Sequence, residues 1–141
     1  MALSFTPVPP ELLNKIWDRV KDLLILPIEV SNNKFDIDSI KMEILGNLKV
    51  LWILFEGDDN LLAAITTSIE QYKNVKMMRI SFAGGENVIE NVDLILDKLR
   101  EFAKSCGCDG IEAFGRKGWE KILKNKNFSA TYVCLEEYFN G

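Results

Sequence analysis

Three apolar stretches follow one another near the middle of the chain, and only short polar turns separate them. Residues 49–55 are apolar on both alternating faces, which is typical of a central strand covered on both sides. Residues 61–72 and 75–82 are rich in residue types that favour strands. Because tight turns join neighbouring strands that run in opposite directions, the sequence predicts an antiparallel meander.

The residues that precede the meander have the apolar spacing of helices. Apolar residues recur every three or four positions in 12–24, after a Pro-Pro-Glu start, and this helix is expected to end before Pro27. A second, shorter helix is predicted over 37–44, with Asp36 as its N-terminal cap and Gly46 as its C-terminal stop.

After the meander, the apolar residues again recur at helical spacing. A long amphipathic helix is predicted from Val88 to an end at residues 105–107, with charged residues on its outer side. A short strand over 110–114, a helix that begins near Trp119 and a last strand over 129–135 complete the chain. Only the step from strand 75–82 through the long helix to strand 110–114 is expected to be parallel.

This order predicts an α/β domain whose mixed, mostly antiparallel sheet carries helices on both faces. An additional strand is compatible with residues 4–8 or with residues 24–30, and Pro27 would confine the latter to a sheet edge. The 141 residues contain no repeat or low-complexity segment. We therefore expect residues 1–141 to form one domain.

The charge of the chain excludes some classes of partner. The formal net charge is −4 and the 17 basic residues are dispersed, which argues against nucleic-acid binding. The longest apolar run, residues 50–55, is far too short to span a membrane, and no targeting segment is found near Met1. We expect a cytoplasmic protein that has no membrane partner.

The chain contains no histidine, which excludes a Ser-His-Asp triad, a Cys-His pair and the common zinc motifs. Its three cysteines are Cys106, Cys108 and Cys134, and no metal site is expected from them. They are interpreted as small buried hydrophobic residues, with a reactive thiol at Cys106 as the alternative. Any catalysis must therefore use carboxylates, Tyr, Cys, Ser or backbone groups.

The junction after strand 75–82 is the candidate binding site. A turn over 83–85 is expected to lead into a helix start, where unpaired N–H groups can hold a phosphate-bearing ligand. Glu86, Glu90 and Asp93 lie close by, and carboxylates both stabilise a helix N-terminus and repel an anion. The residues thus leave two interpretations open, helix capping and phosphate binding.

The element order and this junction resemble the GNAT superfamily of acetyl-CoA-dependent N-acetyltransferases over nearly the whole chain. The resemblance implies that strands 75–82 and 110–114 splay apart and that the pantetheine arm of acetyl-CoA lies in the gap. It also implies a pyrophosphate site on the following turn and an amine as acceptor. The cofactor-binding residues implied by the resemblance are Ile80, Phe82, Ala83, Gly84, Gly85, Glu86, Asn87 and Val88.

Two positions depart from the family pattern. The family turn carries Arg or Gln with spaced glycines, whereas this turn has adjacent glycines and no basic residue. Trp119 stands where the family often has a tyrosine that protonates the CoA thiolate, and an indole cannot do so. The catalytic residues are therefore left unassigned. Candidates are Ser81, Glu112, Tyr132, Cys134 and Tyr138, and Arg116 is a candidate ligand-pairing cation.

The segment around Trp119 and Phe128 also resembles small acetyltransferase-like proteins encoded by tailed phages, some of which are virion or morphogenesis components. Two functions follow from the resemblances. The first is an N-acetyltransferase with acetyl-CoA and an amine as ligands, located in the host cytoplasm if phage-encoded. The second is a non-catalytic virion or interaction protein. Both are compatible with a monomer or with a homodimer that pairs through an edge strand.

Overall fold

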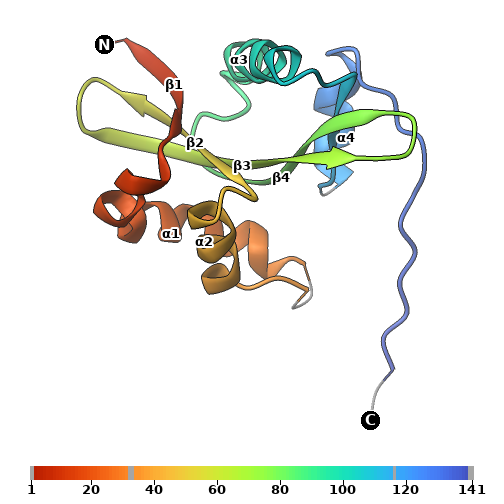
Figure 1. Cartoon of the computed structure of the whole chain (residues 1–141), viewed down its shortest axis with the longest axis horizontal. Coiled ribbons are helices and arrows are strands. Elements are labelled where there is room, and N and C mark those ends of the chain that lie inside the picture. The colour runs from red at the N-terminus through yellow and green to blue at the C-terminus, as the bar shows by residue number, and fades with distance from the viewer. Residues whose placement is uncertain (1, 32–33, 116, 140–141) are drawn as a thin grey trace.

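The computed structural model describes residues 2–31, 34–115 and 117–139, which form a five-stranded sheet with helices against both faces (Figure 1). The elements in chain order are β1 (Leu3–Val8), a 3-10 turn (Pro10–Leu12), α1 (Leu13–Glu29), α2 (Ile37–Leu45), β2 (Val50–Glu56), β3 (Asn60–Gln71), β4 (Lys76–Gly85), α3 (Val92–Ser105), β5 (Gly110–Ala113) and α4 (Lys117–Lys124).

The strands lie in the sheet in their chain order, β1-β2-β3-β4-β5. The first three pairs are antiparallel, and β5 lies parallel to β4 after the crossover through α3. The predicted meander, the single parallel step and the mixed, mostly antiparallel α/β class are confirmed.

Two apolar layers cover the sheet. Helices α1 and α2 pack on one face through side chains such as Leu24 and Ile40, while α3 packs on the other face through Leu99 (Figure 1). Trp52 lies under α3, where its ring is stacked on Phe5 at a centroid distance of 5.2 Å. The sheet is therefore buried on both faces, as the uniformly apolar β2 requires.

The N-terminal elements confirm one prediction and correct another. Of the two candidate positions for an additional strand, residues 4–8 fall in β1, whereas residues 24–30 belong almost entirely to α1. The expected helix end before Pro27 is wrong, because α1 continues through Pro27 to Glu29. The buried side chain of Ile28 keeps the last turn packed on the sheet, which outweighs the hydrogen bond that proline cannot donate.

Helix α2 is capped as the sequence predicts. The Asp36 carboxylate accepts a hydrogen bond from the backbone N–H of Ser39 at 2.9 Å, and Gly46 stands at the C-terminal end of the helix. This backbone hydrogen bond, helped by one from the Ser39 hydroxyl, lowers the pKa of Asp36.

The junction after β4 differs from the predicted one. Residues 83–85 are strand residues that pair with Ile65, Ala64 and Ala63, so the expected turn at these positions is wrong. The turn lies over residues 86–91, and α3 begins at Val92 instead of Val88. The reason is that β3 is long enough to keep pairing, and Val88 is buried as a loop residue.

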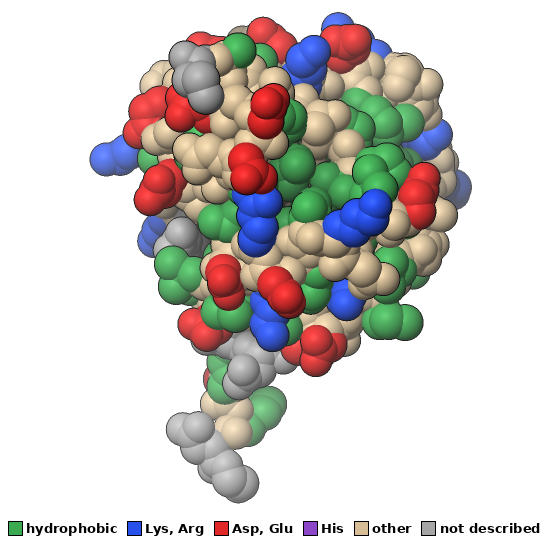
Figure 2. Space-filling view, turned by 90° about the vertical axis from the view of Figure 1, so that its left-hand side faces the viewer, with side chains coloured by type: hydrophobic (Ala, Val, Ile, Leu, Met, Phe, Trp, Pro, Cys, Tyr) green, Lys and Arg blue, Asp and Glu red, His purple; other side chains and the backbone are tan. Residues whose placement is uncertain are grey.

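The predicted last strand over 129–135 is also wrong, because described residues 129–139 have no regular secondary structure. They leave the body after α4 and project from it (Figures 1 and 2). A strand requires a hydrogen-bonded neighbour, and among the described residues this segment pairs with none. Figure 2 also shows a hollow of hydrophobic side chains on the body, with charged side chains around it.

Candidate functional site

Strand β4 extends beyond its neighbour β5. The parallel pairing ends where Ile80 faces Ala113, and β4 continues to Gly85 with β3 as its partner among the described strands. A register shift in the pairing with β3 places Ser81 at the same point. Residues 81–85 therefore have a backbone edge that β5 does not occupy.

A cavity of about 520 Å³ lies at this end of β4. One wall comes from the C-terminal half of α1, with Leu23, Leu26 and Pro27, and another comes from Trp119 of α4. The volume lies within the range of about 300–1,000 Å³ that is usual for small-molecule sites. Sequence patterns gave no signal for the α1 residues, because their contact with β4 is long-range.

The structure brings together most of the predicted cofactor-binding residues. Those that line the cavity are Ala83, Gly84, Gly85, Asn87 and Val88. Ile80 instead packs in the layer under α3, and Phe82 is buried under α1 and α2. The backbone N–H of Glu86 donates to the Leu62 carbonyl at 2.9 Å, which fixes the start of the loop.

The two adjacent glycines are required by packing within the chain. A Cβ on Gly84 would overlap the Leu23 carbonyl, whose usual helical partner is the N–H that Pro27 lacks. Gly85 has φ +114°, and a Cβ there would overlap the Leu62 carbonyl. Substituting Gly85 would therefore disturb β3 directly and cannot by itself report on a ligand.

The loop of residues 86–91 offers unpaired backbone donors. Asn87 has φ 63°, and the Asn91 side chain donates to the Asn87 carbonyl at 2.8 Å instead of capping α3. The N–H groups of residues 87–90 donate to no backbone oxygen of the described chain. Free donors of this kind at the start of a helix favour an anionic group.

The charges at the cavity oppose such a group. Asp22 and Glu90 contribute to the lining, and no Lys or Arg is found among the described lining residues. Asp93 forms an ion pair with Lys126 at 2.8 Å, while Glu86 is exposed outside the lining. Of the three acidic residues singled out in the sequence, Glu90 is the one that lines the cavity.

Trp119 joins the cavity to the core. Its side chain packs against the apolar layer under α3 and also lines the cavity. Gly115 lies against the indole, since a Cβ at Gly115 would be 3.3 Å from Trp119 Cδ1. Arg116 lies outside the described residues.

The candidate catalytic residues fall in different places. The Ser81 hydroxyl is buried and has no hydrogen-bond partner in the described structure. Tyr132, Cys134 and Tyr138 belong to the projecting C-terminal segment and are not among the described residues that line the cavity. Glu112 is held in a polar network on the sheet.

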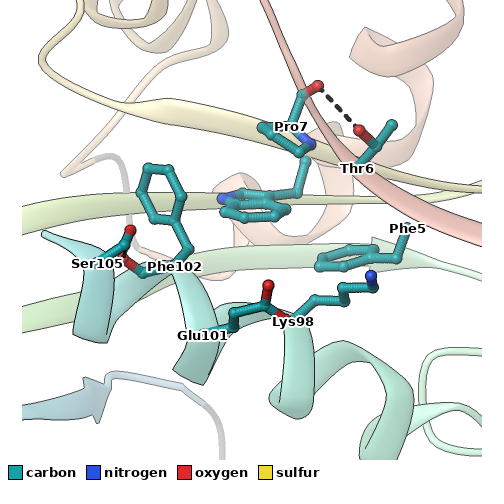
Figure 3. Close-up of a pocket in the computed structure, with 8 residues that line it drawn as sticks. Phe5, Thr6, Pro7, Lys98, Glu101, Phe102 and Ser105 are labelled. Atoms are coloured by element: carbon teal, nitrogen blue, oxygen red, sulfur yellow. Dashed lines mark hydrogen bonds between the residues drawn. The ribbon is translucent and has the colours of Figure 1, made fainter.

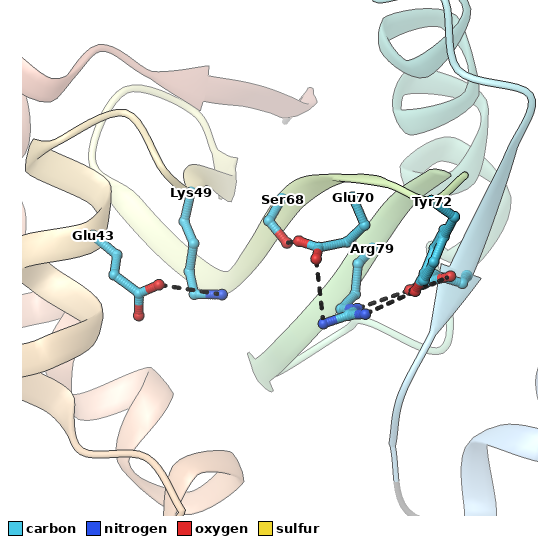
Figure 4. Close-up of polar contacts among 7 residues, drawn as sticks. Glu43, Lys49, Ser68, Glu70, Tyr72 and Arg79 are labelled. Atoms are coloured by element: carbon cyan, nitrogen blue, oxygen red, sulfur yellow. Dashed lines mark hydrogen bonds and ion pairs between the residues drawn. The ribbon is translucent and has the colours of Figure 1, made fainter. Parts of the chain in front are cut away.

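This network ties β3, β4 and β5 together around Arg79 (Figure 4). Arg79 Nε donates to Glu112 at 2.8 Å, and Arg79 Nη2 donates to the Tyr72 hydroxyl at 2.9 Å. Arg79 Nη1 is 3.7 Å from Glu70, and its guanidinium lies 4.4 Å from the Phe114 ring centroid. This cluster was not predicted from the sequence, although a charge inside the apolar stretch 75–82 signals a partnered side chain.

Hydrogen bonds within the network raise the pKa values of two of its groups, Tyr72 and Arg79. The bond to Glu112 raises the pKa of Tyr72, because ionising the phenol would place two negative charges together. Burial lowers the pKa of Arg79, but its bonds to Glu112 and Tyr72 outweigh burial and raise it. Arg79 stays charged, and its donors are engaged within the fold.

A second cavity of about 280 Å³ lies between β1, β2 and α3 (Figure 3). Phe5, Trp52 and Phe102 form its aromatic wall, and Lys98 and Glu101 of α3 stand beside it. Trp52 is fixed there because its indole N–H donates to the Thr67 hydroxyl at 3.0 Å. This cavity is remote from the free edge of β4 and is a gap beside core side chains.

Two general properties of the described residues bear on the site. They contain no helix that is both long enough and apolar enough to cross a bilayer. They also contain no cluster of three or more Cys, Asp or Glu side chains that would suit a metal ion.

No protein-family model matches the sequence, and no curated protein sequence matches it either. Solved structures do match the fold. A protein described as a predicted acetyltransferase with acetyl-CoA, from Clostridium acetobutylicum, is 17% identical with a TM-score of 0.67, over 97% of this chain and 96% of that one.

Two enzymes of known activity align equally well. Glucosamine-6-phosphate N-acetyltransferase from Arabidopsis thaliana is 11% identical with a TM-score of 0.67, over 99% of this chain and all of that chain (100%). An aminoglycoside antibiotic 6'-N-acetyltransferase from Acinetobacter baumannii is 12% identical with a TM-score of 0.68, over 99% of both chains. The chain thus has the GNAT acetyltransferase fold.

Proposed function

We propose that this protein binds an acyl-CoA, acetyl-CoA first of all, and transfers the acyl group to an amine. The observation that carries the proposal is the extension of β4 past β5, with a cavity of about 520 Å³ beside it. When bound, the thioester supplies the activated acyl group. We propose a cytoplasmic location for the protein, which is the host cytoplasm if the protein is phage-encoded.

The free edge of β4 suits the pantetheine arm. An extended chain with amide groups adds to an open strand edge through backbone hydrogen bonds. Phe82 and Ala83 supply the backbone groups in this proposal, while Trp119 and Leu26 supply apolar walls. The carbonyl of Ile80, the other predicted residue of this strand, already accepts a hydrogen bond from the Phe114 N–H at 3.3 Å. The glycines Gly84 and Gly85 keep α1 and β3 close enough to enclose the arm.

The backbone of the loop after β4 suits a pyrophosphate, whereas the acidic side chains near it do not. The free N–H groups of residues 87–90 would hold the anion, with Glu86, Asn87 and Val88 forming the turn around it. Glu90 would weaken this binding by charge repulsion, because it lines the same cavity. Lys126 limits the effect by neutralising Asp93.

Catalysis in this proposal depends mainly on orientation. Holding the thioester and the amine in reacting positions supplies about 7–11 kcal/mol in well-aligned systems. The buried Ser81 hydroxyl is the side-chain donor at the point where β4 and β5 separate, although Ser81 is not among the described lining residues. We assign it the role of positioning the thioester end by a hydrogen bond, which requires the bound arm to reach past the lining. Trp119 cannot protonate the departing thiolate.

A second candidate function is a non-catalytic interaction or virion protein that keeps the fold. The observation that favours it is the acidic lining, with Asp22 and Glu90 and no described cation. Fold similarity alone does not confer activity. None of the three solved relatives named above is described as a phage protein, and the resemblance to phage-encoded proteins stays a prediction.

Calorimetry with acetyl-CoA separates the two functions. Binding at micromolar concentration supports the first, whereas no heat at millimolar acetyl-CoA would contradict it. Glu90→Lys should tighten binding about tenfold, since moving from repulsion to attraction near the surface is worth roughly 1 kcal/mol or more. Glu11→Lys carries the same change in charge at an exposed position outside the cavity lining, and it should leave affinity unchanged.

The acceptor is proposed only as a class. The solved relatives act on a sugar amine and on an aminoglycoside, both of which are amines. A panel of primary amines assayed for free CoA release tests this step once binding is measured. If acetyl-CoA binds but no amine of the panel leads to release of free CoA, the proposed CoA-binding site stands and the proposed acyl-transfer activity is contradicted.

A further inference from the structure

Trp119 lies where the open edge of β4 begins. Beside the last paired residues of β4 and β5, the Phe114 N–H donates to the Ile80 carbonyl at 3.3 Å. Gly115 follows directly, and a Cβ on it would be 3.3 Å from Trp119 Cδ1. Trp119 also lines the cavity together with Ala83 of β4. The indole therefore stands at the fork between the two strands, which we define by Ile80, Phe114 and Gly115.

The indole ring separates the cavity from the apolar core. Trp119 is half-buried and packs against the cluster under α3 that includes Val88, Ile95 and Leu99. Ile95 is 3% exposed, and Leu99 is fully buried. A smaller side chain at position 119 would therefore extend the cavity into apolar surroundings.

The direction of the ligand follows from the proposed acyl-CoA site, on which this inference rests. The pyrophosphate lies at the free N–H groups of residues 87–90, and the pantetheine arm runs back along β4 from there. Residues 81–86 span about 16 Å at the usual rise of a strand. The thioester end is thus the part of the ligand that lies at the fork, next to the indole.

We propose that Trp119 limits the length of the acyl chain, and that the acyl donors are thioesters of short acids with two or three carbons. The indole occupies the space into which a longer chain would extend from the thioester. Gly115 and the cluster under α3 hold the ring in place, so a longer chain has to push it into packed side chains. Forcing extra methylene groups into packed surroundings is unfavourable.

The described residues on the opposite face of the sheet at the fork are charged. Met78 and Ile80 pack under α3, so Arg79 between them points to the other face. The Arg79 guanidinium lies 4.4 Å from the Phe114 ring centroid and pairs with Glu112 at 2.8 Å. An alkyl chain placed there would separate charged groups from their partners, which is costly. This face therefore does not offer a longer chain an alternative place.

The test is calorimetry of the full-length protein with acetyl-, propionyl-, butyryl- and hexanoyl-CoA. The dissociation constants of the first two thioesters should agree within about threefold. Butyryl-CoA and hexanoyl-CoA should bind about tenfold more weakly or worse. Long thioesters that bind as tightly as acetyl-CoA would overturn the length limit and leave the proposed function standing. If no thioester binds, the proposed function fails, and the length limit fails with it.

Trp119→Ala should reverse the preference for short chains. The two added methylene groups of butyryl-CoA would then enter apolar space, so butyryl-CoA should bind about tenfold more tightly than acetyl-CoA. Because alanine removes a side chain that packs on the core, Trp119→Leu is the second variant, and it keeps an apolar side chain in the layer under α3. This variant should bring the two dissociation constants to within about threefold of each other.

Leu26→Ala is the matched control. Leu26 is 59% exposed and lines the cavity from α1. Its truncation removes apolar contact with the arm, so all four thioesters should bind more weakly by the same factor and the preference for short chains should remain. A folded Trp119→Leu protein that keeps the wild-type preference would overturn the role of Trp119. An equal change of preference in Leu26→Ala would overturn it too, because the preference would then not arise at the fork.

Discussion

The first half of β4, residues 76–80, differs from the second half, residues 81–85, in the number of strands it contacts. The first half lies between β3 and β5, and the Arg79 network crosses all three strands. The second half pairs with β3 and faces a cavity where β5 is absent. One strand thus combines a fully paired part with a part whose edge is open.

The difference shows how the chain keeps an open edge without losing order. In the second half, Gly84 and Gly85 let α1 and β3 approach more closely than any other residue would allow. Packing on these sides replaces the support that β5 gives to the first half. An open site therefore depends on close contact elsewhere around the same residues.

Gly84→Ala tests this close contact and should have the largest effect. The added methyl group would overlap the Leu23 carbonyl, which is backbone and cannot rotate away, so we expect a loss of about 3 kcal/mol or more in the free energy of unfolding. The measurement is chemical denaturation. Gly118→Ala, where nothing lies within 4 Å, should be neutral or stabilise α4, and equal losses in both variants would contradict the contact.

Arg79→Met tests the paired half. It removes a charged donor from Glu112 and Tyr72 and leaves the carboxylates without their cation, which should cost about 2 kcal/mol. Arg19→Met, at an exposed pair with Asp59, should change stability by about 0.5 kcal/mol or less. Similar small changes in both variants would show that the network does not hold the three strands together.

Much of the fold could be predicted because its signals are local. The periodicity of 61–72 and the cap at Asp36 report interactions within a few residues, and both predictions are confirmed. The end of α1 could not be read in this way, because Ile28 outweighs Pro27 only through packing on a distant sheet. The strand predicted over 129–135 failed because local propensity does not supply a hydrogen-bonded neighbour, and among the described residues none pairs with this segment.

The candidate site was predictable in position but not in detail. Five of the predicted residues line the cavity, because the strand-loop-helix order brings them together. The glycines were interpreted as ligand contacts, whereas the structure shows that Leu23 and Leu62 already require them. Asp22 and the Arg79 network come from long-range contacts, which a single sequence does not report.

Ser81→Ala tests the open half. Because the buried hydroxyl has no partner, its removal should leave stability unchanged or raise it by up to about 1 kcal/mol. Loss of one hydrogen bond to the ligand should weaken acetyl-CoA binding by about three- to tenfold. Thr66→Val removes the other unpartnered hydroxyl and should not change affinity. Unchanged affinity in both variants would remove Ser81 from the site.

Tyr72→Phe tests the paired half of β4 and is expected to have the smallest and most local effect. Its pKa is raised from 10.0 by the hydrogen bond to Glu112, so the folded protein holds the phenolic proton more tightly than the unfolded chain. The resulting stability is fully present below about pH 10, and it is lost as the pH rises through the folded pKa. Ultraviolet titration should show one tyrosine ionising late, and Tyr72→Phe should remove that step. If the late step persists in this variant, Tyr72 is not its source, and the hydrogen bond to Glu112 does not raise the pKa of Tyr72.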